Sequence, residues 1–155
     1  MRIISWNVNG IRASVKKGLV DQINSHQADI WCFQETKAQD DQVMEALQEL
    51  SSEYHIQSTS AVKKGYSGVA ILAKKSTFDK TAPSWSSGLS IDEHDQEGRV
   101  LRVDAGKFHL VNVYVPNSSS GMKRLPYRKT WDIAFADYLK TLREEKPVIV
   151  TGDFN

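Results

Sequence analysis

The sequence has a single cysteine, Cys32, and no long apolar run among its 155 residues. One cysteine cannot form an internal disulfide bond, which is compatible with a reducing compartment. No segment approaches the roughly 20 apolar residues that cross a bilayer. Residues 1–6 are typical of a β-strand rather than of a signal peptide. We therefore expect a cytoplasmic protein without a membrane partner.

The sequence also has no excess of charge of one sign, because 20 basic and 19 acidic residues leave a net charge of +1. A strongly basic surface over the whole protein is thus excluded, and any surface that binds nucleic acid must be a local patch. The histidines and the cysteine lack the spacing of a zinc site. A phosphate-binding P-loop and the Gly-x-Ser-x-Gly turn of serine hydrolases are absent as well. These three classes of site are excluded.

The pattern of apolar residues predicts an α/β protein. Apolar content is 40%, enough to bury one core, so we expect one domain or a large part of one. Residues 76–98 contain Pro83, Gly88 and several acidic side chains, which indicates a loop. The predicted fold class is a layered α/β arrangement of one mixed sheet with flanking helices. Strands are predicted at 3–8, 30–33, 54–60, 69–73, 100–104, 108–115 and 148–150, and helices at 18–26, 40–50 and 127–143.

Polar side chains stand at the ends of three predicted strands. Asn7 ends the first strand and Glu35 follows the second, while Asp153 and Asn155 follow the last. If these strands lie side by side in one sheet, two carboxylates and two amides gather at its edge. Such hard oxygen ligands suit magnesium, with manganese as the alternative. A metal held there would polarise a phosphate oxygen.

Each of these residues also has a purely structural interpretation. An Asn or Asp after a strand most often forms a turn, and Glu35 is equally consistent with a solvated side chain. The side chains of Trp6, Trp31, Trp131 and Cys32 are typical of core positions. We expect no catalytic role for the four histidines, and a surface, loop or outward-facing position for each of them: His26, His55, His94 and His109.

Seven short motifs together carry a resemblance to a known family. In this order they resemble the exonuclease III family of apurinic/apyrimidinic endonucleases, within the endonuclease/exonuclease/phosphatase fold. Gly-Tyr-Ser-Gly and Glu-Gly-Arg-Val are similar to the DNA-repair branch rather than to the lipid or inositol phosphatases. The motifs are Trp6-Asn7-Val8-Asn9-Gly10-Ile11-Arg12-Ala13, Gln34-Glu35-Thr36-Lys37, Gly65-Tyr66-Ser67-Gly68-Val69, Glu97-Gly98-Arg99-Val100, Tyr114-Val115-Pro116-Asn117, Arg124-Leu125-Pro126-Tyr127-Arg128 with Trp131-Asp132, and Gly152-Asp153-Phe154-Asn155.

The resemblance implies a layered α/β-sandwich and a role for each matching residue. Glu35 would be the principal ligand of Mg²⁺, and Asp153 would activate the attacking water or handle the leaving-group proton. Metal-binding roles are implied for Asn7, Glu35, Asp153 and Asn155. Catalytic roles are implied for Tyr114, Asn117, Asp153 and Asn155. Contacts with the DNA backbone, which position the duplex without reading its sequence, are implied for Arg12, Lys17, Lys37, Gly65, Tyr66 and Arg99.

The implied activity is that of a magnesium-dependent DNA-repair nuclease. It would hydrolyse the phosphodiester bond 5′ to an abasic site in double-stranded DNA. It would also have 3′-phosphodiesterase and 3′→5′ exonuclease activities, so that blocked 3′ ends would be substrates. A bacterial protein of this kind would be associated with the nucleoid. Two alternatives stay open: a related phosphoesterase with another substrate, and a catalytically inactive DNA-binding or interaction fragment.

The sequence departs from the family pattern at three places. Asn9 stands where some relatives have Asp, and Ser120 where some have an Arg that inserts into DNA. The family's chain also continues beyond Gly-Asp-x-Asn with a second sheet, a further catalytic Asp and an Asp-His pair. Residues 1–155 thus resemble the N-terminal part of a single domain, truncated after Gly-Asp-Phe-Asn, and we expect them to be inactive alone.

Truncation would also affect packing. In a sandwich, the two sheets cover each other's inner faces. We therefore expect this half to expose an apolar face formed by parts of strands 30–33, 69–73 and 148–150. A missing C-terminal half or an oligomer partner would cover that face.

Overall fold

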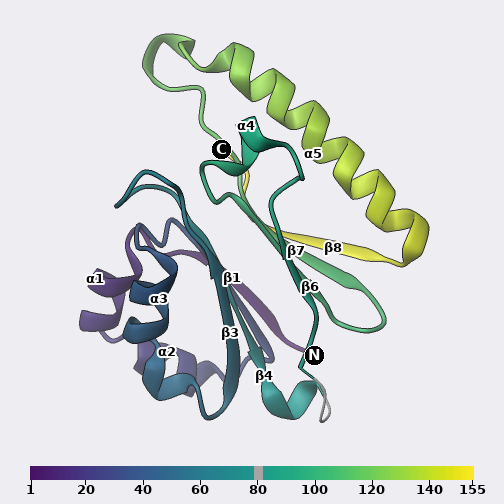
Figure 1. The fold of residues 1–155 in the computed structure, drawn as a ribbon. Coiled ribbons are helices and arrows are strands. Elements are labelled where there is room, and N and C mark those ends of the chain that lie inside the picture. The colour runs from purple at the N-terminus through teal and green to yellow at the C-terminus, as the bar shows by residue number, and fades with distance from the viewer. Residues whose placement is uncertain (79–81) are drawn as a thin grey trace.

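Two four-stranded sheets form the centre of the computed structural model, which describes residues 1–78 and 82–155 (Figure 1). The first sheet has the order β1-β2-β4-β3 and the second the order β5-β6-β7-β8. In each sheet one pair is parallel, β1 with β2 and β7 with β8, and the other neighbours are antiparallel. The strands are β1 (Ile3–Asn7), β2 (Ile30–Gln34), β3 (Tyr54–Thr59), β4 (Val69–Lys74), β5 (Trp85–Ser87), β6 (Val100–Asp104), β7 (His109–Tyr114) and β8 (Val148–Asp153).

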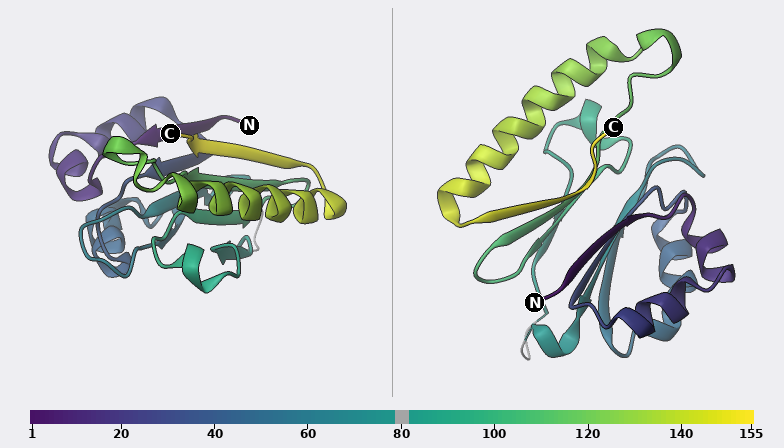
Figure 2. Two further views of the ribbon diagram at one scale, coloured as in Figure 1. Left: turned by 90° about the horizontal axis from the view of Figure 1, so that it is seen from above. Right: turned by 180° about the vertical axis from the view of Figure 1, so that it is seen from behind.

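Helices cover the outer faces of the two sheets. The first three lie on the first sheet, and the long last helix runs along the second (Figures 1 and 2). The helices are α1 (Ile11–Lys16), α2 (Leu19–His26), α3 (Asp40–Ala46), α4 (Asp92–Asp95) and α5 (Leu125–Glu145), with short 3₁₀ turns at Gln48–Leu50, Lys75–Thr77 and Ser120–Met122. Among the described residues, none of these helices combines the length and the apolar character that a membrane span requires.

The core consists of three apolar layers, and β2 contributes to two of them. Trp31 and Phe33 point toward the helices of the first sheet, whereas Ile30 and Cys32 point toward the second sheet. Successive side chains of a strand face opposite sides, so a strand that is covered on both sides reads as a continuous apolar run. The third layer lies between the second sheet and α5, where Trp131 is buried.

The layered α/β class is confirmed, but the structure has two mixed sheets where the sequence predicted one. The second sheet begins after the irregular segment and packs its inner face, including Leu101 and Leu110, onto the first sheet. The prediction that strands 30–33 and 69–73 expose an apolar face is therefore wrong, because these residues are completely or almost completely buried. In β8, Ile149 is 39% exposed.

Two further burial predictions are wrong, and a third residue lies in a short helix instead of the predicted loop. Trp6 is 44% exposed, because β1 is an end strand and has a neighbouring strand on one side of the first sheet. His109 is buried instead of facing solvent, because α5 covers β7; its Nε2 atom lies 3.0 Å from Oε2 of Glu145 on that helix. His94 is also buried and packs edge-on against the ring of Tyr127.

Short elements account for the differences in secondary structure. The sequence predicted no helix at α1, which has six residues and buries only Ile11, too little for a helical period to be visible. The predicted loop 76–98 contains β5 and α4, and Asp95 binds the backbone N–H groups of Leu89 and Ile91. Residues 79–81 of that loop lie outside the described residues.

Candidate active site between the two sheets

Polar strand ends from both sheets meet at one point. Asn7 ends β1 and pairs with Gln34 of β2, which directly precedes Glu35, while Asp153 ends β8 in the other sheet. The Asn7 Nδ2 atom donates hydrogen bonds to Glu35 Oε1 (3.0 Å) and to Asp153 Oδ2 (2.7 Å). The structure thus brings together the strand ends that the sequence placed in one sheet, but it does so across the two sheets.

Glu35 is held by three donors. Besides Asn7, the Tyr114 hydroxyl donates to Glu35 Oε1 at 2.7 Å, and the Lys37 Nζ atom lies 2.9 Å from Glu35 Oε2. Burial raises the pKa of the Glu35 carboxyl, but the hydrogen bonds that it accepts outweigh burial, so this pKa lies below its ordinary value. Glu35 is therefore ionised at neutral pH, as a metal ligand must be.

Burial and the bond to Glu35 also raise the pKa of the Tyr114 hydroxyl far above its ordinary value. Tyr114 therefore keeps its proton at neutral pH. Its hydroxyl group acts in this site as a hydrogen-bond donor and not as a base.

The backbone around Glu35 is unusual and firmly held. Glu35 and Lys37 both have left-handed conformations, with φ of 54° and 49°. The Gly10 N–H binds Glu35 O at 2.7 Å on one side, and the Thr36 N–H binds Gly68 O at 3.1 Å on the other. A Cβ atom at Gly68 would lie 2.2 Å from Thr36 Oγ1, so only glycine fits there. Such conformations persist where their surroundings over-determine them, and they cluster at functional sites.

The amide of Asn7 bridges the carboxylates instead of presenting its oxygen to a metal. Carboxylate oxygens accept hydrogen bonds, so the NH₂ group of Asn7 faces them. The Asn7 oxygen accepts the N–H of Asn9 at 3.0 Å. Of the four residues predicted to bind metal, Glu35 and Asp153 offer carboxylate oxygens here, and Asn7 orients both.

Asn155 adjoins Asp153 at the exposed rim of the site, and Asn117 is exposed two residues after Val115, whose N–H binds Asp153 O. The Asn155 N–H donates to Asp153 Oδ1 at 3.2 Å, and its side-chain Nδ2 donates to Val115 O at 2.9 Å. The Asn117 oxygen accepts the N–H of Ser119 at 3.2 Å. Gly152 allows β8 to approach β7 closely enough for this arrangement, because a Cβ atom there would lie 1.9 Å from Val113 O.

Five of the six residues predicted to contact DNA are exposed or partly exposed. Arg12 and Lys17 are exposed on or just after α1, Gly65 is exposed, and Tyr66 is half-buried. Arg12 also lines a groove of about 690 Å³ between α1 and α3, together with Lys37. Lys37 is at present engaged with Glu35 and with the side chain of Asn9.

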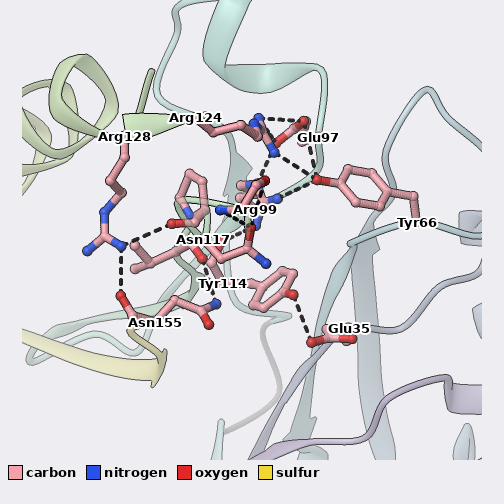
Figure 3. A network of polar contacts seen from close by, with 12 residues as sticks. Glu35, Tyr66, Glu97, Arg99, Tyr114, Asn117, Arg124, Arg128 and Asn155 are labelled. Carbon is pink, nitrogen blue, oxygen red and sulfur yellow. Dashed lines mark hydrogen bonds and ion pairs between the residues drawn. The ribbon is translucent and has the colours of Figure 1, made fainter. Parts of the chain in front are cut away.

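Arg99 does not fit the prediction of a DNA contact, because it is only 3% exposed. Its Nε binds Glu97 Oε2 at 2.7 Å, its Nη1 binds Tyr114 O at 2.9 Å, and its Nη2 binds the Tyr66 hydroxyl at 2.9 Å (Figure 3). The guanidinium group also lies over the Tyr114 ring, 4.7 Å from its centre. All three nitrogens therefore have partners within the protein.

Sequence reasoning missed the role of three charged residues beside the site. Arg124 binds both oxygens of Glu97 through Nη2, at 2.9 and 3.1 Å. Arg128 donates to Pro116 O and Asn155 O, and thereby ties two of the motifs together. All three lie inside motifs that the sequence analysis singled out, but a motif does not state which of its charges pair with one another.

A second missed feature lies deeper between the sheets. The Gln34 Nε2 atom donates to Asn112 Oδ1 at 2.7 Å, and Asn112 Nδ2 donates to the carbonyls of Phe33 and Ala70 at 3.0 and 2.9 Å. Both side chains are almost completely buried. A visible signal existed, since Asn112 stands between the apolar residues Val111 and Val113 of β7.

Comparisons with known proteins agree with this geometry. A model of the endonuclease/exonuclease/phosphatase family matches residues 4–155. An exodeoxyribonuclease of Bacillus subtilis is 42% identical over 157 residues, which cover all of this chain and 58% of that protein. The DNA repair nuclease APEX1 of Danio rerio is 42% identical over 158 residues, which cover all of this chain and 49% of that protein. The chain thus spans between about half and three fifths of these relatives.

Solved structures show the same likeness. The AP endonuclease from Leishmania major has a TM-score of 0.82 and 30% identity, over 98% of this chain and 54% of that one. A 3′-5′ exonuclease from Neisseria meningitidis has a TM-score of 0.79 and 25% identity, over all of this chain and 58% of that one. Since the family model covers nearly the whole chain, this protein belongs to the endonuclease/exonuclease/phosphatase family.

Proposed function

We propose that this chain carries the metal-binding and phosphate-binding part of a DNA-repair nuclease. The nuclease would hydrolyse the phosphodiester bond 5′ to an abasic site, with 3′-phosphodiesterase and 3′→5′ exonuclease activities on blocked or free 3′ ends. The observation that carries the proposal is the bridge from Asn7 to both Glu35 and Asp153. It holds two carboxylates beside each other at a rim that a DNA strand can reach.

Magnesium is the cofactor in this proposal, with manganese as the alternative. Among residues 1–78 and 82–155, no three His, Cys, Asp or Glu side chains form a metal cluster. Mg²⁺, however, is commonly bound by one or two carboxylates together with water and substrate phosphate. Glu35 fits this pattern, because it is ionised and already accommodates the positive charge of Lys37. When bound, the ion would polarise a phosphate oxygen and stabilise the leaving oxygen.

The protein's own side chains divide the remaining tasks. Asp153 would accept a proton from the attacking water, since its carboxylate stands at the end of β8 beside Asn155. Asn117 and Asn155 would orient the phosphate and the water through their amide groups. Tyr114 keeps its proton and would donate a hydrogen bond, either to Glu35 as observed or to a phosphate oxygen. Fixed donors aimed at developing charge are a large part of catalysis in phosphoryl transfer.

Besides Asp153, the described residues place no histidine at the site that could transfer a second proton. In the described part of the chain, none of the four histidines takes part in the hydrogen bonds around Glu35 and Asp153. A further acid or base would then come from outside these residues, and we expect the 155 residues alone not to cleave DNA. The segment or partner that supplies it would adjoin the end strands β1 and β8, on which Trp6 and Ile149 are exposed.

Double-stranded DNA is the proposed partner. The relatives named above include a DNA repair nuclease and an AP endonuclease. Arg12, Lys17 and Gly65 are exposed and would contact the phosphate backbone, with Lys37, which binds Glu35, and Tyr66, which binds Arg99, closer to the scissile bond. Such contacts do not read sequence, which suits an enzyme that recognises a missing base through the deformability of the duplex.

The proposal is tested on a duplex with a single abasic site, in Mg²⁺ and in EDTA. The assay uses the 155-residue chain and any longer form that contains it, each with a Glu35→Gln control. We expect metal-dependent incision 5′ to the abasic site by a longer form, loss of incision in Glu35→Gln, and binding without incision by the 155 residues.

Three outcomes of this assay, repeated with a small phosphodiester as a second substrate, would contradict the proposal or favour an alternative. Cleavage of a small phosphodiester without cleavage of DNA would instead identify a related phosphoesterase, which the family description also covers. Incision that persists in EDTA would contradict the metal site. Absence of cleavage by every form would favour an inactive DNA-binding fragment.

A further inference from the structure

A charged cluster built around one buried arginine stands directly behind the proposed site. It consists of Arg99, Glu97, Arg124 and the hydroxyl group of Tyr66, and we call it the Arg99 cluster (Figure 3). Glu97 accepts from both guanidinium groups, at 2.7 Å from Arg99 and at 2.9 and 3.1 Å from Arg124. Burial raises the pKa of Glu97, but the two guanidinium groups outweigh it, and the pKa lies below its ordinary value. The cluster is therefore ionised and carries one excess positive charge.

The cluster reaches the site through Tyr114. Arg99 holds this residue twice, by a hydrogen bond from Nη1 to Tyr114 O (2.9 Å) and by stacking over the Tyr114 ring (4.7 Å). The ring in turn places its hydroxyl 2.7 Å from Glu35 Oε1. Arg99 itself is 3% exposed and forms no hydrogen bond or ion pair with Glu35, so it reaches that carboxylate through its neighbours, most directly through Tyr114.

The same cluster reaches the turn that precedes β4. The Tyr66 hydroxyl accepts hydrogen bonds from Arg99 Nη2 (2.9 Å) and Arg124 Nη1 (3.0 Å). One residue further on, the Lys37 N–H binds Ser67 O at 2.8 Å, which attaches this turn to the segment next to Glu35. Two short paths therefore lead from the turn to Glu35, one through Arg99 and Tyr114 and one through the backbone at Lys37.

We propose that Arg99 is a positioning residue for the phosphodiester reaction: it fixes the Tyr114 ring, and thereby the Glu35 carboxylate, relative to the turn that carries Tyr66. The planar guanidinium group is required for this role, because it stacks on one ring while its fork binds a carbonyl, a carboxylate and a hydroxyl. A lysine keeps the charge but supplies neither the plane nor the fork. The consequence for metal binding rests on the function proposed above, whereas the positioning of Tyr114 does not.

The test compares Arg99→Lys with Arg102→Lys in the full chain. Arg102 lies on β6, which begins directly after Arg99; it is half-buried and binds Ser86 at 2.9 Å, but it has no contact with Tyr114, which makes it a matched control. The first measurement is the NMR signal of isotope-labelled tyrosine Cζ without metal, with Tyr114 assigned from Tyr114→Phe. Arg99→Lys should shift the Tyr114 signal, which reports its hydrogen bond to Glu35, and Arg102→Lys should not.

The second measurement is the dissociation constant of Mn²⁺, followed by its electron paramagnetic resonance signal. Groups that orient a metal ligand commonly change metal affinity 10–100-fold, so we expect Arg99→Lys and Tyr114→Phe each to weaken Mn²⁺ binding by about tenfold. The double variant should be no weaker than Tyr114→Phe alone, because Arg99 acts through that ring. Equal and independent losses from the two substitutions would overturn the proposal, as would an unchanged Tyr114 signal in folded Arg99→Lys.

A third variant, Glu97→Gln, keeps the proposal testable if Arg99→Lys does not fold. Glu97→Gln keeps the shape of the side chain and weakens its hold on Arg99, so it should shift the Tyr114 signal in the same direction and by less. If Arg99→Lys does not fold, an unchanged signal in Glu97→Gln overturns the proposal. If the wild-type chain binds no Mn²⁺, the function proposed above loses its metal site, while the NMR measurement still decides whether Arg99 positions Tyr114.

Discussion

Two asparagines bridge the sheets in the same way, with different results. Asn112 uses its NH₂ group to bind the carbonyls of Phe33 and Ala70, and Asn7 uses its NH₂ group to bind the carboxylates of Glu35 and Asp153. The first bridge is neutral and 0% exposed, whereas the second is charged and lies at the rim. A neutral buried bridge stabilises the packing of the sheets. A charged bridge that solvent can reach holds groups that are able to bind a metal and accept a proton.

The largest expected effect comes from removing the charge at the exposed bridge. Glu35→Gln in a form that cleaves abasic DNA should lower the incision rate by about 10²–10³-fold, the range found when one stabilising group is lost from an active site. The melting temperature should change little, because the amide keeps the size of the side chain. Incision at the wild-type rate would show that Glu35 is only a solvated carboxylate. The charged bridge at Asn7 would then have no functional role that distinguishes it from the neutral bridge at Asn112.

The buried bridge should respond in the opposite way. Asn112→Ala removes a donor from the buried carbonyls of Phe33 and Ala70, and leaving a buried group unsatisfied costs about 1–3 kcal/mol. We expect the free energy of unfolding, measured with urea, to fall by about 2–3 kcal/mol. Mn²⁺ affinity of the protein that remains folded should stay at the wild-type value. A loss of affinity without a loss of stability would contradict the structural role of Asn112.

Asn7→Ala sharpens the comparison between the two asparagines. It removes the donor shared by Glu35 and Asp153, so the carboxylates repel each other without a bridge. We expect Mn²⁺ binding to weaken by about tenfold, as for other groups that orient metal ligands, and stability to change by less than in Asn112→Ala. Calorimetric titration of Mn²⁺ and urea unfolding of both variants measure the two effects. If Asn7→Ala and Asn112→Ala destabilised the protein equally, the two asparagines would not differ in their structural roles.

The smallest effect concerns pH and separates charged from neutral clusters. The folded state lowers the pKa of Glu97 below the ordinary value of 4.5, because Arg99 and Arg124 outweigh the effect of burial. This contribution to stability is present above 4.5 and is lost as the pH falls through the folded pKa. The difference in stability between wild type and Glu97→Gln should therefore shrink on acidification, whereas the effect of Asn112→Ala should keep its size. Urea unfolding across this range measures both.

The sequence predicted correctly that polar residues at strand ends come together. It did not predict how the charged residues behind them are buried and paired. Asn7, Glu35 and Asp153 were grouped because each follows an apolar strand, and the structure brings these three together. A DNA contact was expected for Arg99 because the family resemblance implies one, yet its side chain is buried. Burial of an arginine depends on partners far along the chain, here Tyr66 and Arg124, and no local pattern records that pairing.

Local composition by itself determined most of the secondary structure, the continuous apolar strand Ile30–Phe33 and the polar residues at strand ends. These features follow from the side-chain period of a strand and from the preference of Asn and Asp for turns. Only the tertiary structure decided that the strands divide into two sheets, that β7 and β8 cover the first sheet, and that Asn7 reaches Asp153 across 146 positions of the chain. Such contacts depend on how whole sheets pack, and a sheet can bury its second face only against another layer.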